Sequence, residues 1–135
     1  MKKSFRKVAS FNLQEMLIVL AIIGILLLIA LPNLMPLITK AKSVEAQTQL
    51  KAIFNAEKQY FFMNSKYSTS LTELDFETPK TVKESGSANY HYEILQASNT
   101  GFKARATAVT DFNGDGTFNV WEIDQNGNPK QTVND

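Results

Sequence analysis

The chain has 135 residues, of which 44% are apolar, 20% charged and 10% aromatic, which fits one folded domain and excludes disordered and collagen-like proteins. It has no cysteine and a single histidine, so disulfides, thiolate metal sites and sites that need two imidazoles are excluded as well. The net charge of +1 conceals a polarity: residues 1–10 carry four basic side chains, and all 13 acidic residues lie at Glu15 or later. The remaining 10 basic and 13 acidic side chains give residues 11–135 a net charge of −3, so they have no excess of positive charge with which to bind nucleic acid.

A long apolar segment follows the basic residues. Residues 16–31 contain no polar side chain, and the apolar character continues to Ile38. These 23 residues would form about 35 Å of helix, enough to cross a hydrocarbon core of roughly 30 Å. The positive-inside rule then predicts that residues 1–10 stay in the cytoplasm while the rest of the chain crosses the membrane.

Three residues of this segment stand out from its apolar composition. Pro32 and Pro36 lack an amide donor and disfavour helical backbone before them, so they predict a kink or partial unwinding. Glu15 places a carboxylate at the start of the apolar run. An ionised carboxylate is costly in the bilayer, so Glu15 is predicted to have a partner or a function.

Residues 1–38, MKKSFRKVASFNLQEMLIVLAIIGILLLIALPNLMPLI, resemble the N-terminus of the type IV pilin family, which includes the pseudopilins of type II secretion. The resemblance implies that residues 1–10 are a leader and that a prepilin peptidase cleaves between Ser10 and Phe11. It also implies that the new amine of Phe11 is methylated and that the apolar helix is retained. Ser10 stands where the family usually has glycine, and Asn-Leu-Gln replaces the commoner Thr-Leu-Ile at residues 12–14.

The resemblance also gives Glu15 a specific hypothesis. When such helices stack with an axial offset, the cationic amine of Phe11 in one subunit can meet the Glu15 carboxylate of its neighbour. Misregistered arrangements would leave a buried charge unpaired, so the pair would fix the register of assembly. The alternative is that Glu15 lies at the cytoplasmic interface without a role.

The second part of the helix becomes amphipathic after Ile38. Leu50, Ile53, Phe54 and Phe61 share one helical face, which predicts a helix from about Asn12 to about Met63 whose second half packs on a sheet. The polar segment 66–86 reads as a loop with a short helix at 70–74, and the family resemblance implies that Tyr67 and Leu71 attach it to the helix.

The remaining residues predict an antiparallel sheet. Residues 89–95, 102–109 and 118–123 read as strands, and turn residues at 126–129 precede a possible fourth. His91 and Glu93 fall on one strand face, which we interpret as solvated rather than catalytic. The expected fold is α+β: a long helix packed on three or four antiparallel strands, with a leader (1–10), a membrane and assembly helix (11–38) and a head (39–135).

Residues 111–122, DFNGDGTFNVWE, match the calcium-loop pattern D-x-[DN]-x-[DN]-G-x5-E. Alternate short oxygen-bearing side chains suit a cation that takes six to eight hard ligands, and Gly116 allows a sharp turn. The strands expected on both sides favour the alternative of a plain hairpin loop. Some pseudopilins resemble this arrangement in using structural calcium, and the predicted ligands are Asp111, Asn113, Asp115, Thr117, Asn119 and Glu122.

These observations predict a non-enzymatic structural subunit of a type IV pilus-like filament. Its expected partners are copies of itself, the prepilin peptidase, an inner-membrane assembly platform, minor pilins and membrane lipid. The precursor would lie in the inner membrane with a periplasmic head, and the filament in the periplasm or on the cell surface. Two alternatives stay open: a pseudopilin of a type II secretion filament, and a monomeric membrane-anchored periplasmic calcium-binding module.

Overall fold

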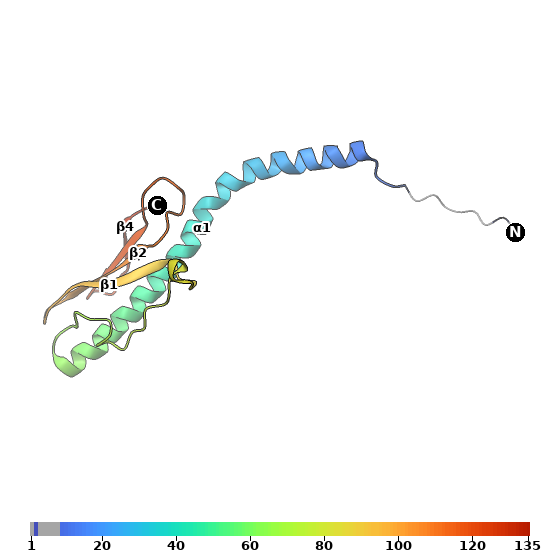
Figure 1. The fold of residues 1–135 in the computed structure, drawn as a ribbon. Helices are drawn as coiled ribbons and strands as arrows, with labels where there is room; N and C mark the ends of the chain where they lie inside the picture. The colour runs from blue at the N-terminus through green and yellow to red at the C-terminus, as the bar shows by residue number, and fades with distance from the viewer. Residues whose placement is uncertain (1, 3–8) are drawn as a thin grey trace. The chain divides into compact units, whose positions relative to one another are not determined.

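The computed structural model describes residue 2 and residues 9–135, and it contains one long helix followed by an antiparallel sheet (Figure 1). This confirms the predicted α+β class. The elements are α1 (Leu13–Asn64), the short 3₁₀ helix η1 (Val82–Glu84), β1 (Tyr90–Ala97), β2 (Phe102–Ala108), β3 (Val120–Asp124) and β4 (Lys130–Val133). The chain divides into two compact units, one ending at Leu34 and one beginning at Met35.

Helix α1 runs within one residue of its predicted bounds. It ends where Ser65 adopts a left-handed conformation (φ 56°) while its amide still donates to the Phe61 carbonyl. The helix is unbroken across Pro32 and Pro36, so the local unwinding suggested by these residues is absent. Next to Pro32, the Asn33 side-chain amide donates to the Ile29 carbonyl at 3.1 Å, which adds a bond where the ladder is weakened.

The sheet of the second unit has the order β1-β2-β3-β4, with every neighbouring pair antiparallel. Such a meander needs only short connections between consecutive strands. Tyr92 pairs with Ala106, which pairs with Trp121, and this row faces the core. The next row, Glu93, Arg105 and Glu122, therefore lies on the opposite face, because successive side chains in a strand alternate.

The core lies between the second half of α1 and the inner face of this sheet. Ala46, Leu50 and Ile53 are fully buried at spacings of four and three, and they pack with buried Tyr90 and Tyr92. Full burial of Leu50 or Ile53 contributes about 1.5–3 kcal/mol each. The inner face of β2 is mostly small: three of its four buried residues are alanines (Phe102, Ala104, Ala106 and Ala108), and small side chains leave room for the tyrosines and the helix.

The first part of the loop between α1 and β1 is attached to the head by aromatic and apolar contacts. Tyr67 stacks on Phe61 with ring centroids 4.7 Å apart and contacts Phe102 at 5.1 Å, and Leu71 packs against the core. The predicted attachment by Tyr67 and Leu71 is thus present. The predicted short helix at 70–74 is wrong, because residues 71–75 form turns and the helical turn of this loop is η1.

Candidate functional site

The predicted cleavage site lies directly before α1. Ala9, Ser10 and Phe11 have no regular secondary structure and are exposed, with Phe11 77% exposed. Most of the predicted leader, residues 1 and 3–8, lies outside the described residues. A peptidase must bind its substrate in an extended form, so an exposed, non-helical Ser10–Phe11 bond is the arrangement that the predicted cleavage requires.

Glu15 takes part in a capping box at the start of α1. The amide of Asn12 donates to Glu15 Oε2 at 3.1 Å, and the amide of Glu15 donates to Asn12 Oδ1 at 2.9 Å. The pair satisfies two amide groups that the first helical turn leaves without partners. Asn12 was not predicted to have this role, although the spacing N-x-x-E before an apolar run is its sequence signal. Within the described residues, Glu15 Oε1 accepts no hydrogen bond, so it can receive a further donor.

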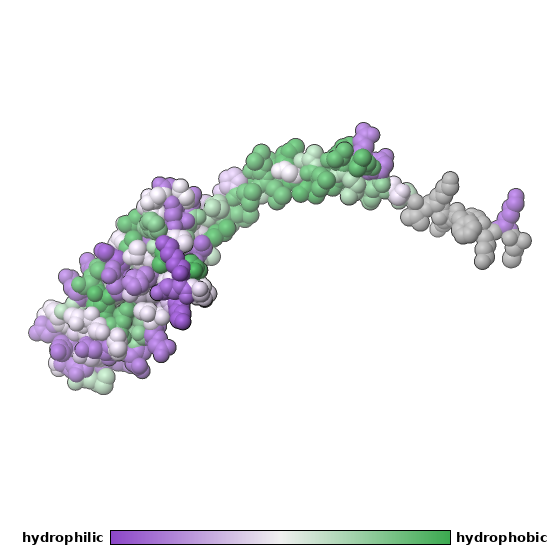
Figure 2. Space-filling view, in the orientation of Figure 1, coloured by the Kyte–Doolittle hydropathy of each residue, from purple (hydrophilic) through white to green (hydrophobic). Residues whose placement is uncertain are grey.

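The apolar part of α1 has its side chains on the outside. The large apolar residues from Leu13 to Ile38 are 42–78% exposed, and Figure 2 shows the continuous apolar surface of this segment. α1 contains a segment long and apolar enough to cross a membrane, and none of that segment is buried. Because exposed apolar surface is unfavourable in water, this segment requires lipid or other protein surfaces around it.

The loop after β2 gathers three carboxylates, from Asp111, Asp115 and Asp135. One oxygen of each lies within 4.8 Å of the others. Two oxygens bound to one calcium ion lie at most about 5 Å apart, so the three side chains can reach a single ion. Asp111 and Asp135 are half-buried and Asp115 is exposed.

Backbone amides hold this loop in shape. Asp111 accepts from the amides of Gly114 and Gly116, each at 2.6 Å, and Asp115 accepts from Thr117 at 2.7 Å. This last bond, with the Asn113 side chain, lowers the pKa of Asp115. Gly116 has φ 86°, a conformation that L side chains rarely adopt, so the turn predicted at this glycine is present.

Two of the six predicted cation ligands point elsewhere. Glu122 lies on β3, where Oε1 accepts from Arg105 Nε at 2.9 Å and Nη2 at 2.7 Å, and Lys103 Nζ lies 3.7 Å from Oε2. Asn119 is fully buried and accepts the Tyr90 hydroxyl at 3.0 Å. Glu122 therefore lies away from the loop because β3 begins before the twelfth position of the motif, and Asn119 lies away from it because its side chain is buried against Tyr90. The carboxylate that lies beside Asp111 and Asp115 is Asp135.

Asp135 was missed because it lies far from the motif in the sequence. The β3–β4 hairpin returns the chain, so that Asp135 accepts from the amides of Phe112 at 2.7 Å and Asn113 at 3.2 Å. The acidic composition of residues 111–135 was the available signal, but it does not specify which carboxylate returns.

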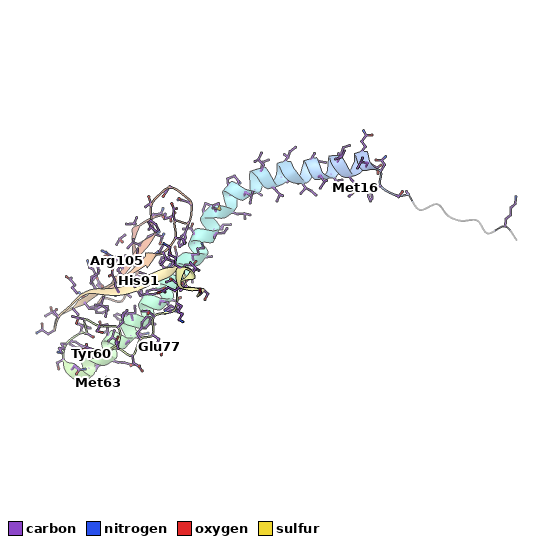
Figure 3. The ribbon with its side chains drawn as sticks, viewed as in Figure 1. Met16, Tyr60, Met63, Glu77, His91 and Arg105 are labelled. Atoms are coloured by element: carbon purple, nitrogen blue, oxygen red, sulfur yellow. The ribbon has the colours of Figure 1, made fainter. Side chains whose placement is uncertain are left out.

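The outer face of the sheet carries His91 and Glu93, both exposed, as expected from the alternation in β1. Arg105 pairs with Glu93 on the neighbouring strand. Figure 3 labels Arg105 and His91 on the sheet. Arg105 is already bonded to Glu122 on its other side. Lys103, Arg105 and Lys130 alternate here with Glu93, Glu122 and Asp124, so charges of both signs share this face.

One further ionisable residue, Glu57, was not predicted to lie in the core. It is fully buried on α1, and its Oε2 accepts from the Ser68 amide at 2.9 Å. Burial raises the pKa of Glu57 to about 7, against the Ser68 hydrogen bond, and the nearby charge of Glu73 adds to the rise. Its spacing of four from Ile53 was the signal that could have placed it on the buried face.

Comparison with known proteins places this architecture in a family. The family model described as "Type IV minor pilin ComP, DNA uptake sequence receptor" matches residues 32–118, which is more than half of the chain. The type IV major pilin protein PilA of Myxococcus xanthus is 44% identical over 66 residues, which are 49% of this chain and 30% of that protein.

Two further relatives belong to secretion systems. The type II secretion system core protein G of Aeromonas hydrophila is 36% identical over 70 residues, 52% of this chain and 49% of that protein. The protein of the same name in Vibrio cholerae is 38% identical over 68 residues, 50% of this chain and 47% of that protein. The matched part thus spans half or less of each relative's length. The chain belongs to the type IV pilin family, as its resemblance at residues 1–38 predicted, and specifically to the group that the ComP minor pilin model describes.

Proposed function

We propose that this chain is a structural subunit of a type IV pilus-like filament and that it polymerises through the N-terminal half of α1. The observation that carries this proposal is the apolar surface of residues 13–38, which is exposed on all sides of the helix. Burial of each large apolar side chain contributes about 1.5–3 kcal/mol, so lipid holds such a helix before assembly and neighbouring copies can hold it afterwards. The filament would lie in the periplasm or on the cell surface.

The arrangement around Glu15 supports the proposed assembly step. Cleavage between Ser10 and Phe11 leaves the Asn12–Glu15 capping box intact, because both residues follow the cleaved bond. Glu15 Oε1 is then available to the methylated amine of Phe11 on a neighbouring subunit. Prepilin peptidase, the assembly platform and minor pilins are the partners that this route requires.

The intact mass of the chain tests this proposal when it is measured in sheared surface material and in membranes of the same cells. A chain that starts at Phe11, carries one added methyl group and occurs in the sheared material supports the filament. A full-length chain confined to membranes contradicts it and favours the anchored-module alternative. We expect Glu15→Gln to be processed but absent from sheared filaments, whereas Gln14→Asn, its neighbour, should assemble as the wild type does.

A pseudopilin of a type II secretion filament is the second candidate. The two relatives named as core protein G favour it, and so does the carboxylate cluster in the head. The same mass measurement separates the two candidates, since a processed chain found only in the membrane fraction indicates a pseudopilin.

We also propose that Asp111, Asp115 and Asp135 bind a structural calcium ion, with Asn113 and the Thr117 carbonyl as further ligands. Three carboxylates brought this close repel one another, and a bound cation would relieve the repulsion. The ion would join the loop after β2 to the end of the β3–β4 hairpin, two segments that Asp135 already connects through hydrogen bonds.

Thermal unfolding of the full chain in detergent micelles tests the calcium proposal, with Trp121 fluorescence as the readout. We expect millimolar CaCl2 to raise the melting temperature, since a ligand at 100 times its Kd stabilises by about 2.7 kcal/mol. Asp135→Asn should lose the rise, and Glu77→Gln, an exposed carboxylate outside the loop, should keep it. An unchanged melting temperature in the wild type would rule out the site.

The name of the family model includes a DNA uptake sequence receptor, but we do not extend that role to this chain. The outer sheet face mixes charges of both signs, and residues 11–135 carry 10 basic against 13 acidic side chains. Phosphate binding needs an excess of basic residues on one surface. We propose no enzymatic role.

A further inference from the structure

Glu57 is a buried carboxylate that the proposed filament function does not use. Its side chain is 0% exposed, and its Oε1 has no hydrogen-bond partner in the described part of the chain. A buried polar atom without a partner is costly, and the cost is greater for a charged group. Burial of Glu57 is therefore unfavourable, and the hydrogen bond from the Ser68 amide to Oε2 offsets part of its cost.

Ser68 connects Glu57 to a second carboxylate. Ser68 is itself buried, and its hydroxyl donates to Glu73 Oε2 at 2.5 Å. The serine thus bonds to α1 through its amide and to Glu73 through its hydroxyl. These contacts lie beside the aromatic contact of Tyr67 with Phe61, so they occur where the loop is attached to the helix.

The surroundings of Glu57 provide no compensating positive charge. The charged side chain that faces it from the loop is Glu73. The buried face of the sheet in the core of this unit consists of Phe102, Ala104 and Ala106 together with the tyrosines of β1, none of which is charged at neutral pH. In the described residues, ion pairs occur at Glu122 and not at Glu57, and Lys58, the next residue of α1, lies over the Phe54 ring.

We propose that Glu57, Ser68 and Glu73 form a pH-sensitive latch that holds residues 66–74 on α1 while Glu57 is protonated and loosens as Glu57 ionises. In the closed loop, the neutral acid is buried at lower cost than the anion. Opening of the loop hydrates the carboxylate, so ionisation favours the open form. Opening would uncover Tyr67, Leu71 and Leu74, which now pack against the core.

The size of the effect follows from the two protonation equilibria. Glu57 has a pKa of about 7 in the closed form, against its ordinary value of 4.5 when the loop is open. The opening equilibrium should therefore rise roughly 70-fold between pH 5 and pH 8 and change little above that.

Hydrogen–deuterium exchange of the Ser68 amide tests the latch in the full chain in detergent micelles. Rates measured by NMR from pH 5 to pH 8 are corrected for the intrinsic pH dependence of amide exchange. We expect the protection of Ser68 to fall by tens-fold in the wild type, to stay constant in Glu57→Gln, and to fall as in the wild type in Glu77→Gln. Ser68 should also be less protected than the Ala108 amide of β2, because the opening is local.

Three results would overturn the latch: a flat wild-type profile, the same fall in Glu57→Gln as in the wild type, or equal protection of Ser68 and Ala108. If Glu57→Gln does not fold, the ¹³C resonance of the Glu57 carboxyl in the wild type decides. A titration midpoint of this resonance near pH 7 that coincides with the loss of Ser68 protection supports the latch. A midpoint below pH 5 refutes it.

Discussion

The turn between β3 and β4 contacts α1 at Gly127, and replacement of this glycine should destabilise the head. Gly127 has φ 78°, and its carbonyl accepts from Lys51 Nζ at 2.5 Å. A Cβ atom placed on Gly127 would lie 2.7 Å from Cζ of Phe54, closer than such contacts allow. Gly127→Ala thus combines two perturbations: a left-handed backbone and a clash with an aromatic ring.

Gly114 separates these two perturbations. It has nearly the same backbone conformation, φ 84°, but a Cβ there would have no atom within 4 Å. An L-residue in the left-handed conformation costs about 1–2 kcal/mol, and overpacking costs a further 1–3 kcal/mol or so. Gly114→Ala should therefore lower the free energy of unfolding by about 1–2 kcal/mol, and Gly127→Ala by about 2–5 kcal/mol.

Urea unfolding of the full chain in detergent micelles, followed by the fluorescence of Trp121, measures both variants. Trp121 suits this purpose because it is the one tryptophan of the chain and lies on β3. The measurement is made without added divalent cations, since Gly114 lies in the proposed calcium loop. Equal losses of stability in the two variants would show that the Phe54 ring moves aside without a cost in free energy. This result would refute the predicted steric clash.

Three further substitutions test the core by the same unfolding assay. Ile53→Ala, at a fully buried position, should lower the free energy of unfolding by about 2–5 kcal/mol. Val44→Ala, at a position 56% exposed on the same helix, should change it by less than about 0.5 kcal/mol. Similar losses in the two variants would contradict the packing of Ile53. The wild type should lose about 2–3 kcal/mol of stability between pH 5 and pH 7.5, because folded Glu57 keeps its proton up to about pH 7 while unfolded Glu57 releases it near 4.5. Glu57→Gln should remove this loss, and an equal slope in the variant would assign the loss to other groups.

The fold was predictable because its signals are local and periodic. The apolar face of Leu50 and Ile53 and the alternation around Tyr90 and Tyr92 each specify an element and its buried side. The same rule failed at Glu57, which occupies a position of the buried face that hydrophobic periodicity assigns to an apolar residue. Its place in the core depends on the Ser68 amide, 11 residues away, and no pattern of residue types encodes that contact.

The capping box was readable in principle, since Asn12 and Glu15 have the spacing that such boxes require. The cost of a carboxylate in the bilayer predicts a partner for Glu15 and does not indicate that the partner lies in the same helix. The structure shows that one oxygen of the same carboxylate also serves the helix of its own chain. The proposed contact with a neighbouring subunit is compatible with this capping because a carboxylate has two oxygens and several acceptor positions.

The calcium motif shows why a spacing alone does not define a ligand set. In a loop between helices, the twelfth residue can turn back toward the ion, but here Glu122 is the third residue of β3. The register places it opposite Arg105, and the alternation of the strand directs its carboxylate to the outer face, where Arg105 binds it. In the proposed site a different carboxylate takes this place, that of Asp135, which the β3–β4 hairpin brings to the amides of Phe112 and Asn113. The calcium affinity of the proposed site therefore depends on formation of the hairpin, and we expect loss of β4 pairing and loss of the ion to occur together.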